Sequence, residues 1–202
     1  MAYTTPRTWV ASETVTAALM NTHVRDNISY LKAQSDYALT KNLWIGNWTP
    51  RETAGAGAPA VLTAGTKYYT YVPFASDSTE AAYANVPMPV NYDGSTITAR
   101  FYWTHPTTTT NFGVRWGIQV ASATNDEALD ATFGSQVEVT DTGGTASNLY
   151  VSDVTAAITI GGAPDDHHLI HFDVYRKHDH VDDTMAVDAY LLGVLITYGV
   201  VG

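Results

Sequence analysis

The chain has no cysteine, few charged side chains and no hydrophobic run long enough to cross a bilayer. Without cysteine, neither a disulfide framework nor a thiolate metal site can form. Lys and Arg number 10 against 20 Asp and Glu, which gives a formal net charge of −10 at pH 7. Nucleic acids and anionic membrane surfaces bind clustered basic side chains, so we expect neither as a partner. The most apolar run, AYLLGVLITYGVVG, is too short for a membrane span and predicts a final buried strand.

The motifs of several enzyme classes are also missing. The sequence has no G-x-S-x-G turn for a nucleophilic serine and no phosphate loop of the form G-x-x-x-x-G-K-[ST]. DTGGT at 141–145 matches aspartic proteases in letters only, because the partner loop is absent and a Gly-Gly turn explains it. We therefore predict a protein that is not an enzyme and uses no cofactor.

The longest organised pattern in the chain is an alternation of period two that begins after Thr66. The 202 residues, 45% of them hydrophobic, suffice for one β domain with an appendage. The predicted strands are 67–74, 82–90, 95–104, 112–122, 136–140, 148–160, 169–176 and 185–198. Eight strands separated by turn-like segments predict a mainly β fold over 67–202. We expect an antiparallel two-sheet sandwich, resembling a jelly roll, preceded by one N-terminal α-helix.

The segment TWVASETVTAALMNTHVRDNISYLK predicts a single amphipathic helix within an N-terminal region, 1–41. Thr14 or Thr16 can cap it, because a hydroxyl ahead of an apolar periodic run accepts hydrogen bonds from free amides of the first turn. Its broad apolar face, interrupted by polar side chains, is typical of helices that pack on copies of themselves. The face can alternatively lie on the β domain. The residues assigned to attachment and oligomerisation are Trp9, Met20, Val24, Asn27, Ile28 and Leu31.

Residues 42–66 are rich in Gly, Ala, Pro and Thr, and this composition predicts a linker. Trp44 and Trp48 are exceptions within it. Since two exposed tryptophans would be costly, we expect both to pack against the β domain or a neighbouring subunit. Trp103 and Trp116 lie in predicted strands and are expected in the core or at an interface.

Five of the seven histidines lie in the stretch DDHHLIHFDVYRKHDHVDD. On a strand, His171, Asp173 and Tyr175 would share one face. His171, His178 and His180 are candidate metal ligands, because imidazole and carboxylate groups suit divalent ions. We favour a polar strand face and a solvated acidic loop instead, and expect no metal, because no complete ligand set is present. At a threefold axis, His171 or His178 could bind a shared ion or repel their copies on protonation.

The abundance of aromatic residues supports an alternative function. Thirteen tyrosines and five tryptophans could stack on sugar rings, as in lectin-like sandwiches. Tyr68, Tyr69 and Tyr71, at the entry to the β domain, are the candidate ligand-binding residues. The alternative to a structural role is therefore a carbohydrate-binding module that acts as a receptor-binding protein. A metal-dependent hydrolase is a further alternative, although no base is placed beside a nucleophile.

The stretch TPRTWVASETVTAALMNTHVRDNISYLK resembles a segment near the N-terminus of many tailed-bacteriophage structural proteins of the tail fibre, minor tail and head fibre types. Ser12 stands where glycine is expected, and Met20 where leucine is. VPMPVNYDGSTITARFYWTH, VRWGIQVAS and DAYLLGVLITY are similar to a recurrent β domain of phage virions. The matching residues near the N-terminus are Thr8, Trp9, Val10, Ala11, Glu13, Val15, Thr16, Ala17, Ala18, Asn21, Thr22, His23, Arg25, Asp26 and Asn27.

This resemblance implies a virion component that is a homotrimer with an N-terminal attachment region and a distal knob. Such a protein would be a short fibre or decoration spike of the virion that can adhere to the host surface. Its partners would be capsid or tail proteins and a host surface glycan. Trp9 would serve as an apolar anchor in an extended segment, which Pro6 keeps out of a helix.

Overall fold

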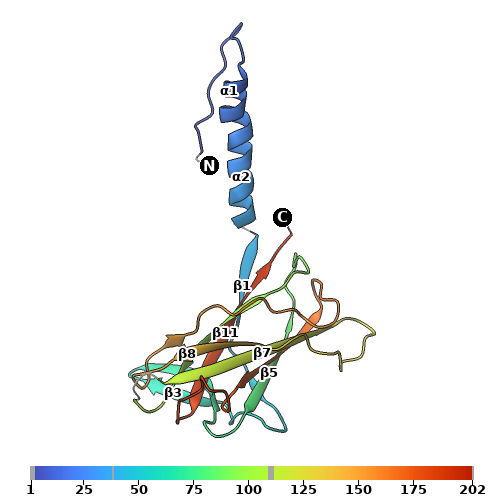
Figure 1. The fold of residues 1–202 in the computed structure, drawn as a ribbon. Helices are drawn as coiled ribbons and strands as arrows, with labels where there is room; N and C mark the ends of the chain where they lie inside the picture. Colours follow the sequence, from blue (N-terminus) through green and yellow to red (C-terminus); the bar gives the residue numbers. More distant parts are fainter. Residues whose placement is uncertain (1–2, 38, 109–111, 202) are drawn as a thin grey trace. The chain divides into compact units, whose positions relative to one another are not determined.

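The computed structural model describes residues 3–37, 39–108 and 112–201, with side-chain burial described for all of these except 33–37. Its contacts divide the chain into two compact units. One unit runs to Thr40 and the other from Lys41 to Val201. Figure 1 shows the strands of the larger unit in colours from light blue to red.

The larger unit is a sandwich of two sheets whose strand pairs are antiparallel. The first sheet has the order β3-β4-β11-β6-β9, with β1 also paired to β11, and the second has the order β2-β5-β10-β7-β8. The first contains β1 (Thr40–Ile45), β3 (Ala60–Ala64), β4 (Lys67–Phe74), β6 (Thr98–Thr104), β9 (Tyr150–Val151) and β11 (Ala189–Gly199). The second contains β2 (Thr49–Pro50), β5 (Glu80–Pro87), β7 (Gly113–Ala123), β8 (Val137–Thr142) and β10 (Leu169–Arg176). The predicted fold class, a jelly-roll-like two-sheet sandwich after an N-terminal helix, is confirmed.

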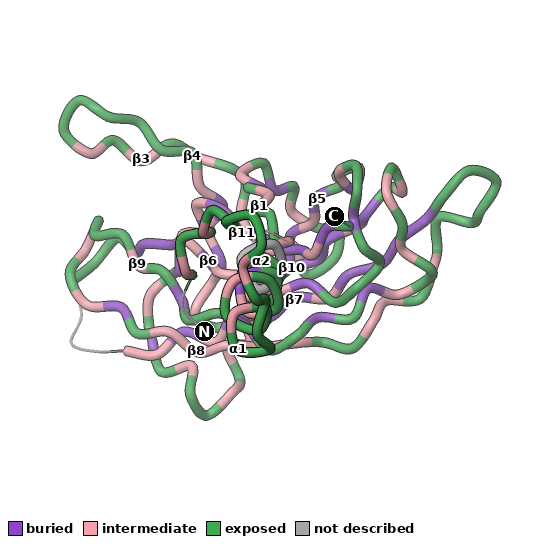
Figure 2. Tube along the Cα trace, turned by 90° about the horizontal axis from the view of Figure 1, so that it is seen from above, coloured by how far each residue is buried: buried purple, intermediate pink, exposed green. Residues whose placement is uncertain are grey.

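The core lies between the sheets and follows the alternation of the strands. Figure 2 shows this alternation as purple segments that interchange with pink and green ones along the chain. Trp116 is fully buried, with the ring of Phe101 stacked on it at a centroid distance of 5.5 Å and Phe74 edge-on at 5.2 Å. Trp103 is also fully buried. Both strand tryptophans are therefore core residues.

A buried ion pair ties the loop after β10 to the body of the sandwich. Arg176 and Asp183 have no more than 1% of their side chains exposed, and the two are joined at 2.7 Å. The Arg176 guanidinium also donates to the backbone carbonyls of Met185 and Val187. Because its donors are used inside the protein, the burial of this charge is well compensated.

Residues 42–66 are not a linker, and this prediction is corrected by the structure. β1, β2 and β3 all arise from this segment or its border and pair with β11, β5 and β4 respectively. Trp48 is buried and its indole N–H donates to the Ile45 carbonyl at 3.0 Å. Trp44 is half exposed and meets the Tyr102 ring edge-on. Composition was misleading here because Gly, Ala, Pro and Thr dominate the segment, and β2 has only two residues.

The β3–β4 hairpin extends beyond the pairing of β4 with β11. β3 pairs with β4 from Ala60↔Tyr71 to Ala64↔Lys67, whereas β11 pairs with β4 only from Val72 onward. Figure 2 shows the hairpin reaching away from the other strands of the sandwich, with an exposed tip. Gly65 at this tip has φ +63°, a left-handed conformation that glycine adopts without strain.

The predicted strand 148–160 forms a strand only over Tyr150–Val151. Beyond this point, side chains take over part of the pairing with β6. The hydroxyl of Ser152 accepts from the Phe101 amide, and that of Thr155 accepts from the Ala99 amide, each at 3.0 Å. Ser and Thr hydroxyls compete with backbone partners in this way, which ends the regular ladder.

The smaller unit contains α1 (Ala17–Met20), a π-helical turn η1 (Asn21–Arg25) and α2 (Asp26–Tyr37). Thr16 caps α1, with its hydroxyl accepting from the Leu19 amide at 3.3 Å. The prediction that Thr14 or Thr16 caps the helix is thus confirmed for Thr16. Before it, the Glu13 carboxylate binds both the Arg7 guanidinium and the Val10 amide, which holds a non-helical turn. Within the described ranges, no helix has the length and apolarity that a membrane crossing requires.

An extended arm lies along the helix and is held by Asn27. The side-chain oxygen of Asn27 accepts from the backbone amide of Thr4 at 3.0 Å, and the side-chain NH2 group of Asn27 donates to the backbone carbonyl of Thr4 at 2.7 Å. Among the residues of this unit whose burial is described, Asn27 is the buried one. It therefore makes its contacts within the chain. The other five residues assigned to attachment are exposed: Trp9, Met20, Val24, Ile28 and Leu31.

Candidate functional site

The outer face of the second sheet carries polar and aromatic side chains. On β10, Ile170, Phe172 and Val174 are fully buried in the core. The alternation of the strand therefore places His171 and Asp173 on the outer face. Tyr175 shares this face, as the sequence predicted.

The strand register sets the neighbours of this polar row. β5 places Asn85 opposite His171 and Tyr83 opposite Asp173. On the other side, β7 places Gln119 opposite Asp173. Three strands that are distant in sequence thus contribute one group of side chains.

Four adjoining hollows cover this face, and we call them together the outer groove. His171 borders three of them. The hollow over Arg51 and Tyr83 has a volume of about 520 Å³, and the one beside Phe133 about 590 Å³. Two smaller hollows, each of about 190 Å³, lie beside Asn85 and over Asp173. Volumes of this size suit a small ligand or a short stretch of a polymer.

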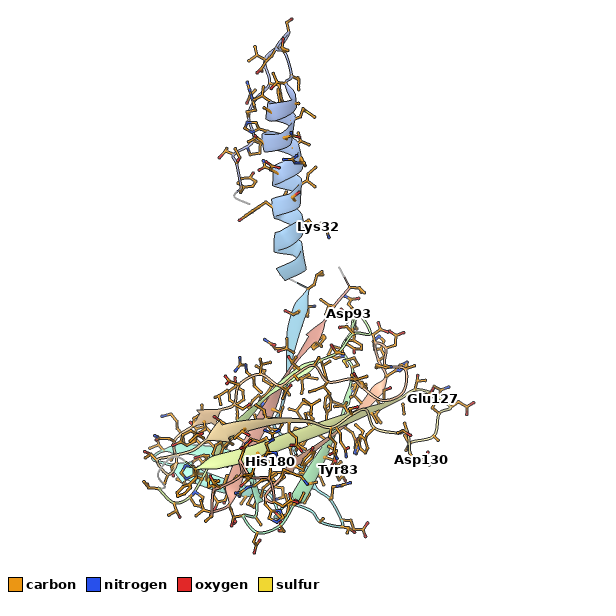
Figure 3. All side chains as sticks on the ribbon, in the orientation of Figure 1. Lys32, Tyr83, Asp93, Glu127, Asp130 and His180 are labelled. Carbon is orange, nitrogen blue, oxygen red and sulfur yellow. The ribbon has the colours of Figure 1, made fainter. Side chains whose placement is uncertain are left out.

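Three rings meet at the centre of the outer groove. The Tyr83 ring is stacked on the His171 ring, with centroids 5.5 Å apart and planes 19° apart. The Phe133 ring is tilted against the other side of the group, also at 5.5 Å from His171. Phe133 comes from the segment that follows β7. Figure 3 labels Tyr83 on β5 and Asp130 in that segment.

His171 presents a hydrogen-bond acceptor at this centre. Burial lowers the pKa of His171, Asp173 opposes this effect, and Arg51 adds to it. The ring is therefore neutral at pH 7. Its Nδ1 lies 2.7 Å from the carbonyl oxygen of Asn85, so Nδ1 carries the proton and donates it. Nε2 is left with a lone pair, and the side-chain NH2 group of Asn85 has no hydrogen-bond partner among the described residues.

Asp173 forms the floor of the outer groove and is only 1% exposed. Its Oδ2 accepts from the Gln119 amide at 2.7 Å, and Gln119 in turn accepts from Gln136 at 3.3 Å. Its Oδ1 has no hydrogen-bond partner in the described part of the chain, and the nearest cation, Arg51 Nε, is 3.5 Å away. Burial raises the pKa of Asp173, while Gln119, Arg51 and His171 act in the opposite direction.

Tyr175 closes the floor on the other side of Asp173. Its hydroxyl donates to Glu138 at 3.1 Å, and Glu138 is held by Arg115 at 3.0 Å. Burial raises the pKa of Tyr175, and the Glu138 carboxylate adds to this effect. A side chain at Gly117 would place its Cβ 2.2 Å from the Tyr175 ring, so glycine is required there. Tyr175 is thus fixed in place and supports the outer groove.

The three histidines considered as metal ligands are not brought together. His178 Nδ1 contacts the Thr79 hydroxyl at 2.9 Å, and His180 Nδ1 accepts from the Asp182 amide at 3.1 Å, both in the turn after β10. His171 lies in the outer groove instead. Among the residues that the structure describes, no group of three His, Asp or Glu side chains is arranged to hold a metal ion.

The tyrosines proposed to bind a ligand lie elsewhere. Tyr68 and Tyr69 are exposed on the β3–β4 hairpin, and Tyr71 stacks on Tyr190 at 4.1 Å. All of them belong to the first sheet, whereas the outer groove lies on the second. Sequence reasoning missed Tyr83, Asn85, Gln119, Arg51 and Phe133. Single polar residues within apolar strands, such as Gln119 in VRWGIQVAS, were the available signal.

No protein-family model and no curated protein sequence matches the chain. Among solved structures, it is similar to the CBM22-2 xylan-binding domain of Paenibacillus barcinonensis Xyn10C, with 14% identity over 76% of this chain and 92% of that one and a TM-score of 0.43. It is also similar to the family 11 carbohydrate-binding module of Clostridium thermocellum, solved with a β-1,3-1,4-mixed-linked tetrasaccharide. The identity is 7% over 80% of this chain and 89% of that one, with a TM-score of 0.39. For TmCBM61, solved with β-1,4-galactotriose, the identity is 9% over 83% of this chain and 92% of that one, with a TM-score of 0.33. At these TM-scores the similarity assigns no function to this chain.

Proposed function

We propose that the β-sandwich is a non-catalytic binding module for a neutral glycan and that the outer groove is its binding site. The observation that carries this proposal is the combination of three clustered rings with a row of planar polar side chains on an open sheet face. Rings offer flat apolar surfaces to the C–H faces of sugars. Amide and guanidinium groups both match the many hydroxyls of a sugar.

The polar row is held in place before any ligand arrives. Gln136 donates to Gln119 and Gln119 donates to Asp173, so the orientation of each amide is set by the next. Arg51 is 45% exposed at its side chain and lies beside the buried Asp173 carboxylate. A groove whose donors are already oriented binds with a smaller loss of entropy.

The charges of the outer groove favour a neutral ligand. Arg51 is balanced by Asp173, and Lys177 is paired with Asp179 at 3.1 Å. An acidic sugar would therefore find no unbalanced cation along this row. The net charge of −10 opposes the approach of a polyanion as well.

A second function is favoured by the smaller unit. Its apolar side chains Trp9, Val24, Ile28 and Leu31 are exposed, and its single buried residue among those with described burial is the polar Asn27. Such a unit needs a partner to cover it. In keeping with the resemblance to phage structural proteins, we propose that it attaches a homotrimeric protein to a virion. The groove would then bind a glycan of the host surface.

The glycan proposal is tested by screening the full chain on a glycan array and measuring the best glycan by calorimetry. Tyr83→Ala should weaken that binding about two- to tenfold, because it removes a stacking surface worth about 0.5–1.5 kcal/mol and the support of His171. Tyr68→Ala is the matched control, since Tyr68 is an exposed tyrosine outside the groove, and it should bind normally. Absence of binding to every glycan would refute the proposal, as would equal loss in both variants.

The attachment proposal is tested separately in particles. Removal of residues 1–40 should abolish incorporation into virions, because the exposed apolar residues of the smaller unit are lost. Circular dichroism of the truncated protein shows whether the β-sandwich remains folded. Incorporation at normal copy number would contradict the attachment role.

A further inference from the structure

One hollow of the outer groove is lined mainly by aliphatic side chains. It lies beside His171 and Asn85, has a volume of about 190 Å³, and its walls include Ala121, Leu129 and Leu169. Leu129 is 83% exposed and Leu169 is 41% exposed. Two large aliphatic side chains thus face solvent at the edge of a polar groove, where they can cover an apolar group of a ligand.

Two residues that line this hollow carry one free donor and one free acceptor. The Asn85 carbonyl oxygen is occupied by His171 Nδ1–H, which leaves the Asn85 amide free to donate. The neutral His171 ring retains the lone pair of Nε2 as an acceptor. Both groups border the same hollow.

We propose that this hollow binds the acetamido group of an N-acetylated sugar in the glycan. The methyl group lies against Leu129, Leu169 and Ala121. The acetamido carbonyl accepts from the Asn85 amide, and its N–H donates to His171 Nε2. This assignment rests on the proposed function of the groove and names the class of sugar that the groove selects.

Other common substituents of sugars fit the hollow less well. A hydroxymethyl group would place a polar oxygen against the leucines, and a carboxylate would lose water there without a cation, because Arg51 borders other hollows. A deoxy-sugar methyl group would use the walls but leave the Asn85 amide and His171 Nε2 unmatched. The acetamido group alone among these satisfies the walls and both polar atoms.

The experiment measures binding of the full chain to pairs of glycans on the array that differ only in an acetamido or hydroxyl group. Penta-N-acetylchitopentaose and cellopentaose form one such pair, and N-acetylgalactosamine- and galactose-terminated glycans form another. Within the pair that contains the best ligand, we expect the acetylated member to bind at least tenfold more tightly. Leu129→Asp should remove most of this preference, whereas Val181→Asp, a control at an equally exposed loop position (84%), should retain it.

The outcomes separate the two proposals. Binding of both members of the pair with equal affinity would overturn the acetamido assignment and leave the glycan-binding function standing. A preference for the acetylated member that stays unchanged in Leu129→Asp and in Asn85→Ala would also overturn the assignment. Failure to bind any glycan of the array would overturn both. A preference that is lost in Leu129→Asp and in Asn85→Ala but kept in Val181→Asp supports the hollow as the acetamido site.

Discussion

Two buried aspartates of the larger unit meet an arginine in opposite ways. Asp183 is joined to the fully buried Arg176 at 2.7 Å, and the guanidinium is further bonded to backbone carbonyls. Asp173 is as buried as Asp183, but its Oδ1 is unpaired and Arg51 is 3.5 Å away with nearly half of its side chain exposed. The first pair is closed by direct hydrogen bonds, and the second is not. Burial of a carboxylate therefore does not determine how it is paired, because one of these two carboxylates is fully hydrogen-bonded and the other is not.

The origin of each arginine explains the difference. Arg176 belongs to the end of β10, and Asp183 follows seven residues later in a loop that folds back on it. Arg51 comes from the segment after β2 and is fixed through its backbone amide, which donates to the Ala81 carbonyl at 3.1 Å. Its side chain is therefore free to adjust to a ligand, while that of Arg176 is enclosed.

The largest effect is expected from breaking the buried Arg176–Asp183 ion pair. Asp183→Asn should lower the free energy of unfolding by about 3–5 kcal/mol, because it leaves the Arg176 charge buried without its counter-ion. Urea denaturation measures this change. Asp179→Asn is the control, since the Lys177–Asp179 pair is exposed and screened by solvent, so its loss should change stability far less. A loss below 1 kcal/mol for Asp183→Asn would show that the two pairs do not differ as described.

The corresponding change in the Arg51–Asp173 pair should affect glycan binding and the free energy of unfolding differently. Asp173→Asn should weaken glycan binding by about 1.5–3 kcal/mol, because the charge that orients Gln119 and attracts Arg51 is lost. It should not lower the free energy of unfolding at pH 7. Burial raises the pKa of Asp173, which means that the folded state disfavours its charged form. Calorimetry with the best glycan and urea denaturation of the same samples give the two values.

The sign of this effect can be checked against pH. The unfavourable contribution of the Asp173 charge is present above its raised pKa and is relieved as the pH falls through that value toward 3.8. The stability advantage of Asp173→Asn over the wild type should therefore shrink between pH 7 and pH 4. An advantage that grows on acidification would contradict the cause given for the raised pKa.

A smaller effect on glycan affinity is expected when His171, the hydrogen-bond acceptor of the outer groove, is protonated. Burial lowers the pKa of His171 below 6.5, so glycan affinity should be constant at neutral pH and fall as the pH passes through the lowered pKa, where Nε2 gains a proton. The same shift makes the folded state lose stability as the pH falls below 6.5. His171→Asn should remove this pH dependence of binding. Titrations between pH 8 and pH 5 test the prediction, and a rise in affinity on acidification would refute it.

The smallest effect is expected in the turn after β10. His178→Gln and His180→Gln should each change the free energy of unfolding by no more than about 0.5 kcal/mol, as surface substitutions usually do. A chelator should leave the thermal melting of the wild type unchanged, because these side chains contact Thr79 and the Asp182 amide rather than one another. A drop in melting temperature with chelator would indicate a metal site instead.

The sequence predicted β4 and β10 to the residue, because both are bounded by polar turns and because apolar and polar side chains alternate along most of β10. It did not predict the strands within 42–66, because Gly, Ala, Pro and Thr dominate that segment and β2 has only two residues. For the groove, alternation along β10 placed His171 with Asp173. Their partners come from separate segments, and the strand register that unites them depends on long-range pairing rather than on local pattern. Arg51 was missed for a further reason, since it lies in the segment interpreted as a linker.

The β3–β4 hairpin offers a place to label the protein. Its tip at Gly65 has nothing within 4 Å of the position that a Cβ would occupy, and it lies on the sheet opposite the groove. A peptide tag or a fluorophore inserted after Gly65 would lengthen an exposed turn, and each doubling of a loop costs only about 0.6 kcal/mol. A tag at this position leaves every residue of the outer groove unchanged, so the tagged chain can report the proposed binding of a glycan.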